Sequence, residues 1–265
     1  MVLSELWIYP VKSLGGIRLK TSQVQQRGLQ YDRRWMIVDD HGSFLTQRTN
    51  PKMASLGLSS HEDGFTIFSK LHPGRSILLP FLPDSAEKVQ VKIWKDIVDA
   101  VTVSSIIDAW LSQELGKMVR LVFMPESTSR MMHPDDSPES SLISFTDDFP
   151  FLLISQASLD DLNSRLDSPV TMQRFRPNLV VSQTQAFGED SWKTIKIGHL
   201  NFLVAKPCDR CVLINVNPEL AVKETEPLKT LAGYRKIDKK IFFGQNVIGL
   251  DTGIISEGDS IHVLK

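Results

Sequence analysis

Both cysteines of the 265-residue chain lie in one motif, Pro207-Cys208-Asp209-Arg210-Cys211. A thiolate is a soft ligand and a nucleophile, so this spacing suits either a redox-active metal centre or dithiol exchange. A thioredoxin-type CxxC normally opens a helix, whose N-terminus lowers the thiol pKa. Here the β-branched run at 212–216 predicts a strand directly after the motif, which disfavours dithiol exchange.

A structural zinc site is also disfavoured. Such a site is usually four-coordinate, and the six histidines show no paired ligand spacing. What remains is a soft thiolate beside Arg210, able to bind one metal centre whose other ligands come from a cofactor. The plainer alternative is a cysteine pair, Cys208 and Cys211, without chemistry.

The composition is that of an ordinary soluble globular chain, 42% hydrophobic and 23% charged. A net charge of −1 gives no general attraction to nucleic acid or to an anionic membrane, so a basic site must be local and suited to a small anion. The chain has no apolar run of about 18 residues, and its first residues show no basic region followed by an apolar stretch, as a signal peptide would. We therefore expect no membrane span and a cytoplasmic location. Two cysteines are too few for a disulfide scaffold, which fits a reducing compartment.

The elements that must position the motif are mostly strands. In the first half, β-rich runs separated by turn residues predict strands at 6–9, 35–38, 65–68, 89–94 and 98–103, with hairpin connections at 40–42 and 62–64. This half therefore predicts a β-barrel. The pattern then changes to a helical period at 105–115, which Gly116 ends, and the turn residues at 125–141 predict a loop.

The second half is also mostly strand. A buried run at 149–154 leads into a helix predicted over 156–166, with Ser158 and Asp161 at capping-box spacing. Further strands are predicted at 179–182, 194–197, 202–205, 211–216 and 260–264. The fold class is therefore mainly β (α+β), with a few helices.

Five short motifs occur in one order along the chain: Tyr9-Pro10-Val11-Lys12-Ser13, Asp32-Arg33-Arg34-Trp35, Arg174-Phe175-Arg176-Pro177-Asn178, Phe187-Gly188-Glu189-Asp190-Ser191-Trp192 and Pro207 to Cys211. Together they resemble the MOSC superfamily, in the branch with an N-terminal β-barrel domain that includes bacterial YcbX proteins and the mitochondrial amidoxime-reducing component. The resemblance implies an N-terminal MOSC-type β-barrel domain at 1–118 and a C-terminal MOSC β-barrel domain at 119–265, which share a cleft.

The same resemblance assigns the site. It implies a molybdenum–molybdopterin cofactor, with Cys211 as the catalytic residue and metal ligand and Cys208 as a supporting residue. The remaining cofactor-binding positions hold the phosphate and the polar edges of the pterin, where ammonium and guanidinium groups suit an anion. They are Lys12, Ser13, Arg33, Arg176, Asp209, Arg210 and Asn246.

Three departures from the family pattern bear on that site. Asp209 stands where relatives commonly have serine, Asn246 stands where the mitochondrial relatives have tyrosine, and Ile214-Asn215 replaces a threonine pair. The substrate pocket is therefore expected to differ from theirs. Asp147 and Asp148 fall in a loop that contacts the cofactor in relatives.

The resemblance implies a molybdenum-dependent oxidoreductase that reduces small N-hydroxylated compounds: amidoximes, hydroxylamines or N-hydroxylated bases. Electrons are expected from a separate donor protein, because two cysteines cannot hold an iron–sulfur cluster and the chain has no GxGxxG dinucleotide loop. One alternative is a sulfur or molybdenum-cofactor carrier. A third possibility is pyridoxal-phosphate binding, with Lys12 as the candidate amine.

Overall fold

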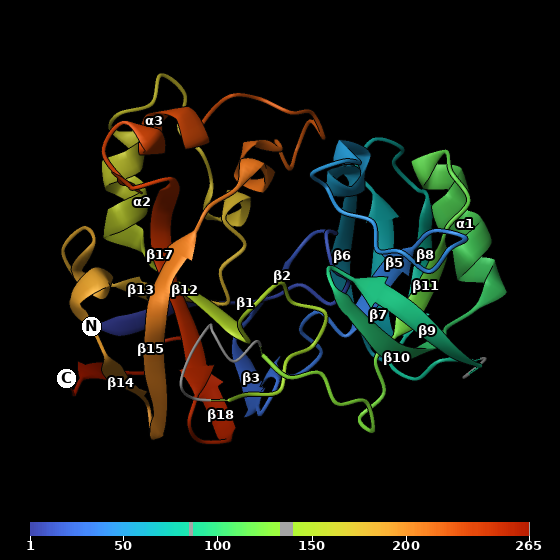
Figure 1. The fold of residues 1–265 in the computed structure, drawn as a ribbon, viewed down its shortest axis with the longest axis horizontal. Helices are drawn as coiled ribbons and strands as arrows, with labels where there is room; N and C mark the ends of the chain where they lie inside the picture. Colours follow the sequence, from blue (N-terminus) through green and yellow to red (C-terminus); the bar gives the residue numbers. More distant parts are fainter. Residues whose placement is uncertain (85–86, 133–139, 265) are drawn as a thin grey trace.

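Strands dominate both halves of the chain in the computed structural model, which describes residues 1–84, 87–132 and 140–264. Figure 1 shows two lobes side by side, one with α1 and strands β5 to β11 and the other with α2, α3 and most of the later strands. The first strands lie between them. The predicted mainly β fold is therefore confirmed.

The second lobe is built on a twisted sheet with the order β19-β14-β15-β17-β12-β13-β1-β2, in which β16 pairs with β17. Only β12 and β13 run parallel among its described neighbours. Its strands are β1 (Val2–Ile8), β2 (Ile17–Leu19), β12 (Phe151–Ser155), β13 (Leu179–Ser182), β14 (Thr194–Ile197), β15 (Leu200–Asp209), β16 (Lys236–Ile237), β17 (Lys240–Gly249) and β19 (Ile261–Val263).

The first lobe contains two smaller sheets, with the orders β5-β11-β10-β9 and β6-β7-β8. Their strands are β5 (Trp35–Val38), β6 (Leu56–His61), β7 (Gly64–Ser69), β8 (Ser76–Pro80), β9 (Lys88–Ile93), β10 (Asp96–Thr102) and β11 (Arg120–Phe123). A third small sheet, β18-β3-β4, joins β3 (Thr21–Gln25) and β4 (Gly28–Leu29) to β18 (Gly253–Ser256) near the other end of the chain.

The first strands tie the two lobes together. β1 pairs with β13 and β3 pairs with β18, so segments before residue 26 share sheets with segments after residue 178. A continuous hydrophobic cluster also extends from Phe65 in the first lobe to Phe202 in the second. The boundary at 118/119 stays a prediction, although the packing shows that the lobes share one core.

Helix α1 (Ser105–Leu115) has the predicted bounds, and Gly116 ends it in the left-handed conformation with φ 69°. Helix α2 (Gln156–Asn163) is shorter than predicted, and its N-cap is Ser155, whose hydroxyl accepts a hydrogen bond from the Ser158 amide. The buried carboxylate of Glu189 accepts from the Ser155 amide and the Ser158 hydroxyl, and so fixes the start of the helix. A third helix, α3 (Leu228–Ala232), is short.

The strand predicted at 211–216 is wrong. Strand β15 ends at Asp209, and Val212–Asn215 form a 3₁₀ helix. Tertiary contacts override the β-branched pattern, since Ile214 is buried in a cluster with Phe175 and Phe243. The Asn215 amide also donates to the Thr225 carbonyl. The turn signals at 133–138 in the predicted loop lie outside the described residues.

Candidate functional site

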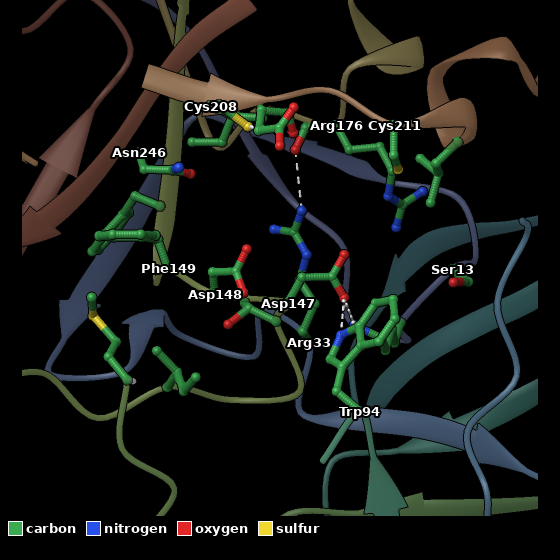
Figure 2. Close-up of a pocket in the computed structure, with 18 of the residues that line it drawn as sticks. Ser13, Arg33, Trp94, Asp147, Asp148, Phe149, Arg176, Cys208, Cys211 and Asn246 are labelled. Carbon is green, nitrogen blue, oxygen red and sulfur yellow. Dashed lines mark hydrogen bonds and ion pairs between the residues drawn. The ribbon is translucent and has the colours of Figure 1, made fainter. Parts of the chain in front are cut away.

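A cavity of about 1310 Å³ receives side chains from both lobes. Every site residue predicted from the sequence lines it: Lys12, Ser13, Arg33, Arg176, Asp209, Arg210, Cys211 and Asn246. Figure 2 shows Cys208 and Cys211 on one side of this cavity, with Trp94, Asp147 and Arg33 across from them. Residues separated by more than two hundred positions in sequence thus meet around one space.

The two thiols differ in environment. Cys211 is exposed at the start of the 3₁₀ helix, whereas Cys208 is partly buried in β15. Cys208 and Asp209 are in a strand, and the Cys211 backbone is extended, with φ −108° and ψ −179°. Because a 3₁₀ helix follows Cys211 in place of the predicted strand, dithiol exchange is no longer disfavoured on that ground, and each thiol instead accepts a hydrogen bond from a different arginine.

Cys208 contacts Arg210. Its Sγ accepts a hydrogen bond of 3.2 Å from Arg210, whose other terminal nitrogen donates to the Phe175 carbonyl at 2.7 Å. Burial raises the pKa of the Cys208 thiol, although Arg210 opposes the shift. Cys208 thus helps to hold Arg210 in place and stays protonated more readily than an exposed thiol.

Arg48 reaches Cys211 from the first lobe. Its Nε donates to the Cys211 Sγ at 3.1 Å, and its Nη2 donates to Asp147 at 2.7 Å. Asp147 also accepts from Lys12 Nζ at 2.5 Å and from the Trp94 indole at 3.1 Å. These contacts join the lobes directly at the thiol.

The charges in this network keep Asp147 ionised. Burial alone would raise the pKa of its carboxyl group, but Lys12 and Arg48 together hold that pKa well below its usual range. Burial lowers the pKa of Lys12 to about 8, although Asp147 favours its charged form. Asp147 is therefore a hydrogen-bond acceptor at neutral pH and has no proton to donate.

A pair of guanidinium groups also lines the cavity. Arg33 and Arg176 lie over the ring of the buried Tyr9, at 4.3 and 4.2 Å from its centroid. Arg33 pairs with Asp32 at 2.6 Å, and Arg176 Nη1 donates to the Leu14 carbonyl at 2.7 Å. Arg176 Nη2 is buried and has no hydrogen-bond partner among the described residues.

This guanidinium pair is costly for the fold. Burial and the adjacent Arg33 lower the pKa of Arg176 to about 10. Ser13, Arg33 and Arg176 have positive φ angles of 67°, 49° and 57°, a conformation that non-glycine residues seldom adopt. Strained backbone and an unpaired buried donor persist where surrounding structure imposes them, often at binding sites. The arrangement suits an anion.

The three sequence departures have different consequences. The Asp209 carboxylate lies 3.6 Å from Lys240 Nζ, so its charge is partly balanced on the cavity rim. Asn246 lies in β17, opposite Leu152 of β12, and lines the cavity. Asn215 does not line the cavity, because its side chain holds the 225–228 segment in place.

Sequence reasoning missed Arg48, Trp94 and Arg130. Arg130 is buried and donates to the carbonyl groups of Ser144 and Thr146, which places the loop that carries Asp147. None of the three lies in a motif that the sequence analysis used. No signal in the sequence marked them, since Trp94 falls at the end of the strand predicted at 89–94 and only the structure places it in a turn.

The comparisons with known proteins agree with this architecture. Residues 1–118 match the MOSC N-terminal beta barrel domain, and residues 141–262 match the MOSC domain. The chain is 31% identical over 280 residues to mitochondrial amidoxime-reducing component 1 of Homo sapiens, a match that covers 99% of this chain and 82% of that protein. The chain belongs to the MOSC family.

The chain is also similar to a molybdenum cofactor sulfurase and to a solved bacterial structure. Molybdenum cofactor sulfurase of Oryza sativa subsp. japonica is 33% identical over 280 residues, which cover 97% of this chain and 33% of that protein. Among solved structures, the YUAD protein of Bacillus subtilis aligns over 98% of this chain with 10% identity and a TM-score of 0.44.

The described residues of this MOSC chain contain neither a metal-ion cluster nor a membrane-spanning helix. Within residues 1–84, 87–132 and 140–264, no cluster of His, Cys, Asp and Glu side chains is suited to hold a metal ion by itself. No helix in the same residues is long and apolar enough to cross a membrane.

Proposed function

We propose that this MOSC protein is a molybdenum-cofactor-dependent reductase of small N-hydroxylated compounds. The observation that carries the proposal is the placement, in one cavity, of the exposed Cys211 thiol and a half-buried guanidinium pair, in which Nη2 of Arg176 is buried without a partner among the described residues. A molybdopterin cofactor has a soft metal at one end and a phosphate at the other, so the donor set fits it.

The chain's own residues would hold and orient this cofactor. Cys211 is the proposed thiolate ligand, and Arg48 fixes its Sγ by the 3.1 Å hydrogen bond. Arg33 and Arg176, with Lys12, Ser13 and Arg210, are the proposed phosphate and pterin contacts. When bound, the molybdenum centre would supply Lewis acidity and two-electron redox chemistry.

The overall reaction consumes two electrons and two protons, and converts an N-hydroxyl group into an N–H group and water. The ionised Asp147 cannot supply a proton at neutral pH, so we assign it the positioning of Lys12, Arg48 and Trp94. A separate donor protein is proposed for the electrons, because a second redox centre of the iron–sulfur type needs more thiols than the chain contains.

Protein purified from a host that makes the cofactor is expected to reduce benzamidoxime or hydroxylamine with a reduced dye donor. It is expected to show no steady turnover with NADH or NADPH alone. Product formation measures turnover with the dye donor, and nicotinamide absorbance measures turnover with NADH or NADPH. Steady turnover with NADH and no added partner would contradict the proposal of a separate electron donor. If metal-loaded protein reduced no N-hydroxylated substrate with any donor, the proposed reductase function would be wrong.

Two observations favour a second candidate, a sulfur carrier. Cys211 is exposed, and a relative of the chain is named a molybdenum cofactor sulfurase. An exposed thiol that receives a hydrogen bond from a guanidinium group could hold a persulfide. Intact-protein mass spectrometry that finds one added sulfur atom, lost in Cys211→Ser, would favour the carrier over the reductase.

A further inference from the structure

The hairpin between β9 and β10 places a strained aromatic residue in the cavity wall. Ile93 pairs with Asp96, so Trp94 and Lys95 form a two-residue turn. Trp94 has φ 54°, in the left-handed region where such turns favour Asn, Asp or Gly. A bulky residue in this conformation is an outlier, and strain of this kind often accompanies a binding role.

Contacts on several sides hold the Trp94 side chain in place. Its Nε1 donates to Asp147 at 3.1 Å, the Arg48 guanidinium lies 5.0 Å from its ring centroid, and the Phe44 ring is tilted against it at 5.1 Å. The residue is nevertheless 44% exposed, and it lines the cavity. Figure 2 shows the indole across the cavity from the cysteines. Through Arg48, it is one side chain away from Cys211.

Two lysines flank this indole. Lys92 precedes Trp94 by two positions in the β9 hairpin, Lys95 follows it directly, and both are exposed and line the same cavity. Neither ammonium group has a hydrogen-bond or ion-pair partner among the described residues. By contrast, Lys12, Arg48 and Arg130 have carboxylate partners. Since the whole chain carries a net charge of −1, this free positive charge is a local feature.

We propose that Trp94, Lys92 and Lys95 form a substrate subsite for a planar N-hydroxylated base that carries a phosphate, as in an N-hydroxylated nucleotide. The proposal rests on the reductase function proposed above. Every nucleobase has a flat π-face, so any of them can stack on an aromatic side chain. Ammonium groups bind a phosphate as point charges. This subsite is separate from the guanidinium pair over Tyr9, which is assigned to the cofactor.

The kinetic test compares three substrates on cofactor-loaded protein with a dye donor: the 5′-monophosphate of N-hydroxylated adenosine, the corresponding nucleoside, and hydroxylamine. The monophosphate is expected to have the lower KM of the two planar substrates. Lys92→Ser with Lys95→Ser should raise the KM for the monophosphate about three- to tenfold and leave that for the nucleoside within about twofold. Lys88→Ser, an exposed lysine on β9 that does not line the cavity, is the matched control and should change neither.

Trp94→Asn tests the aromatic part of the subsite with a residue that the turn favours, so this variant is expected to fold. It should lower kcat/KM for both planar substrates about tenfold more than it lowers kcat/KM for hydroxylamine. Ile97→Ala, at a position 62% exposed on the same hairpin, is the control and should leave all three values unchanged. Equal losses for planar and small substrates would overturn the stacking role.

Calorimetry with adenosine monophosphate separates this proposal from the reductase function, because binding needs no turnover. Weaker binding in the lysine and Trp94 variants would support the subsite even if the protein reduced no N-hydroxylated compound. If the lysine pair affected neither binding nor the monophosphate KM, the subsite would be overturned. Binding that depended on Arg176 alone would place the phosphate at the residues assigned to the cofactor and also overturn the subsite.

Discussion

Cys211→Ser is expected to lower the rate of N-hydroxyl reduction by about a hundredfold or more. Loss of a residue that merely supports a metal ligand typically costs about ten- to a hundredfold, and Cys211 is the proposed ligand itself. Its Sγ is exposed to the cavity and is fixed by Arg48. Steady-state reduction of benzamidoxime with a dye donor measures the effect, beside the molybdenum content of the same preparation.

Cys208→Ser is the matched control for this prediction. A serine hydroxyl can still accept the hydrogen bond that Arg210 donates to Cys208, so most of the metal and of the activity should remain. Thermal unfolding of each variant shows whether the fold is intact. If Cys211→Ser kept full metal and activity while Cys208→Ser lost both, the ligand assignment would be reversed.

Arg176→Ala is expected to reduce cofactor retention about tenfold or more. A charge-assisted hydrogen bond to a bound anion contributes about 1.5–3 kcal/mol, and about 1.4 kcal/mol corresponds to a factor of ten in affinity. The buried Nη2 of Arg176 has no other partner among the described residues, so an anion is its proposed acceptor. Lys12→Ala and Arg33→Ala should act in the same direction. Pterin fluorescence after gel filtration measures retention.

Arg174→Ala provides the control for buried arginine in general. Arg174 is buried two positions before Arg176, but it pairs with Glu224 and does not line the cavity. Its loss should lower stability while the folded protein keeps its pterin. Equal loss of pterin from folded Arg174→Ala and Arg176→Ala variants would show that the effect is structural, and unchanged pterin in Arg176→Ala would place the phosphate elsewhere.

Local patterns in the sequence were sufficient for much of the fold. The bounds of α1 follow from a helical apolar period that ends at Gly116, and the strand at 35–38 follows from a short apolar run. Residues 212–216 show the limit of such patterns, because burial of Ile214 and the bonds of Asn215 decide their structure. A β-branched run alone carries no information about these distant partners.

Some residues of the candidate site were predicted from the sequence, and others were found only in the structure. Its predicted residues came from a family resemblance in short motifs, and the structure brings all of them to one cavity, although their roles stay predictions. Arg48 and Trp94 could not be found from the sequence, since their importance lies in contacts with Cys211 and Asp147 across the two lobes. Neither sequence spacing nor helical or strand periodicity encodes a contact over that separation.

The most direct test of the central claim is the molybdenum and pterin content of the protein purified from a host that synthesises the cofactor. Mass spectrometry of the metal and fluorescence of the released pterin give both values for one sample. We predict close to one molybdenum and one pterin per chain, with both reduced in Arg176→Ala. Correctly folded protein that carried neither molybdenum nor pterin would contradict the account.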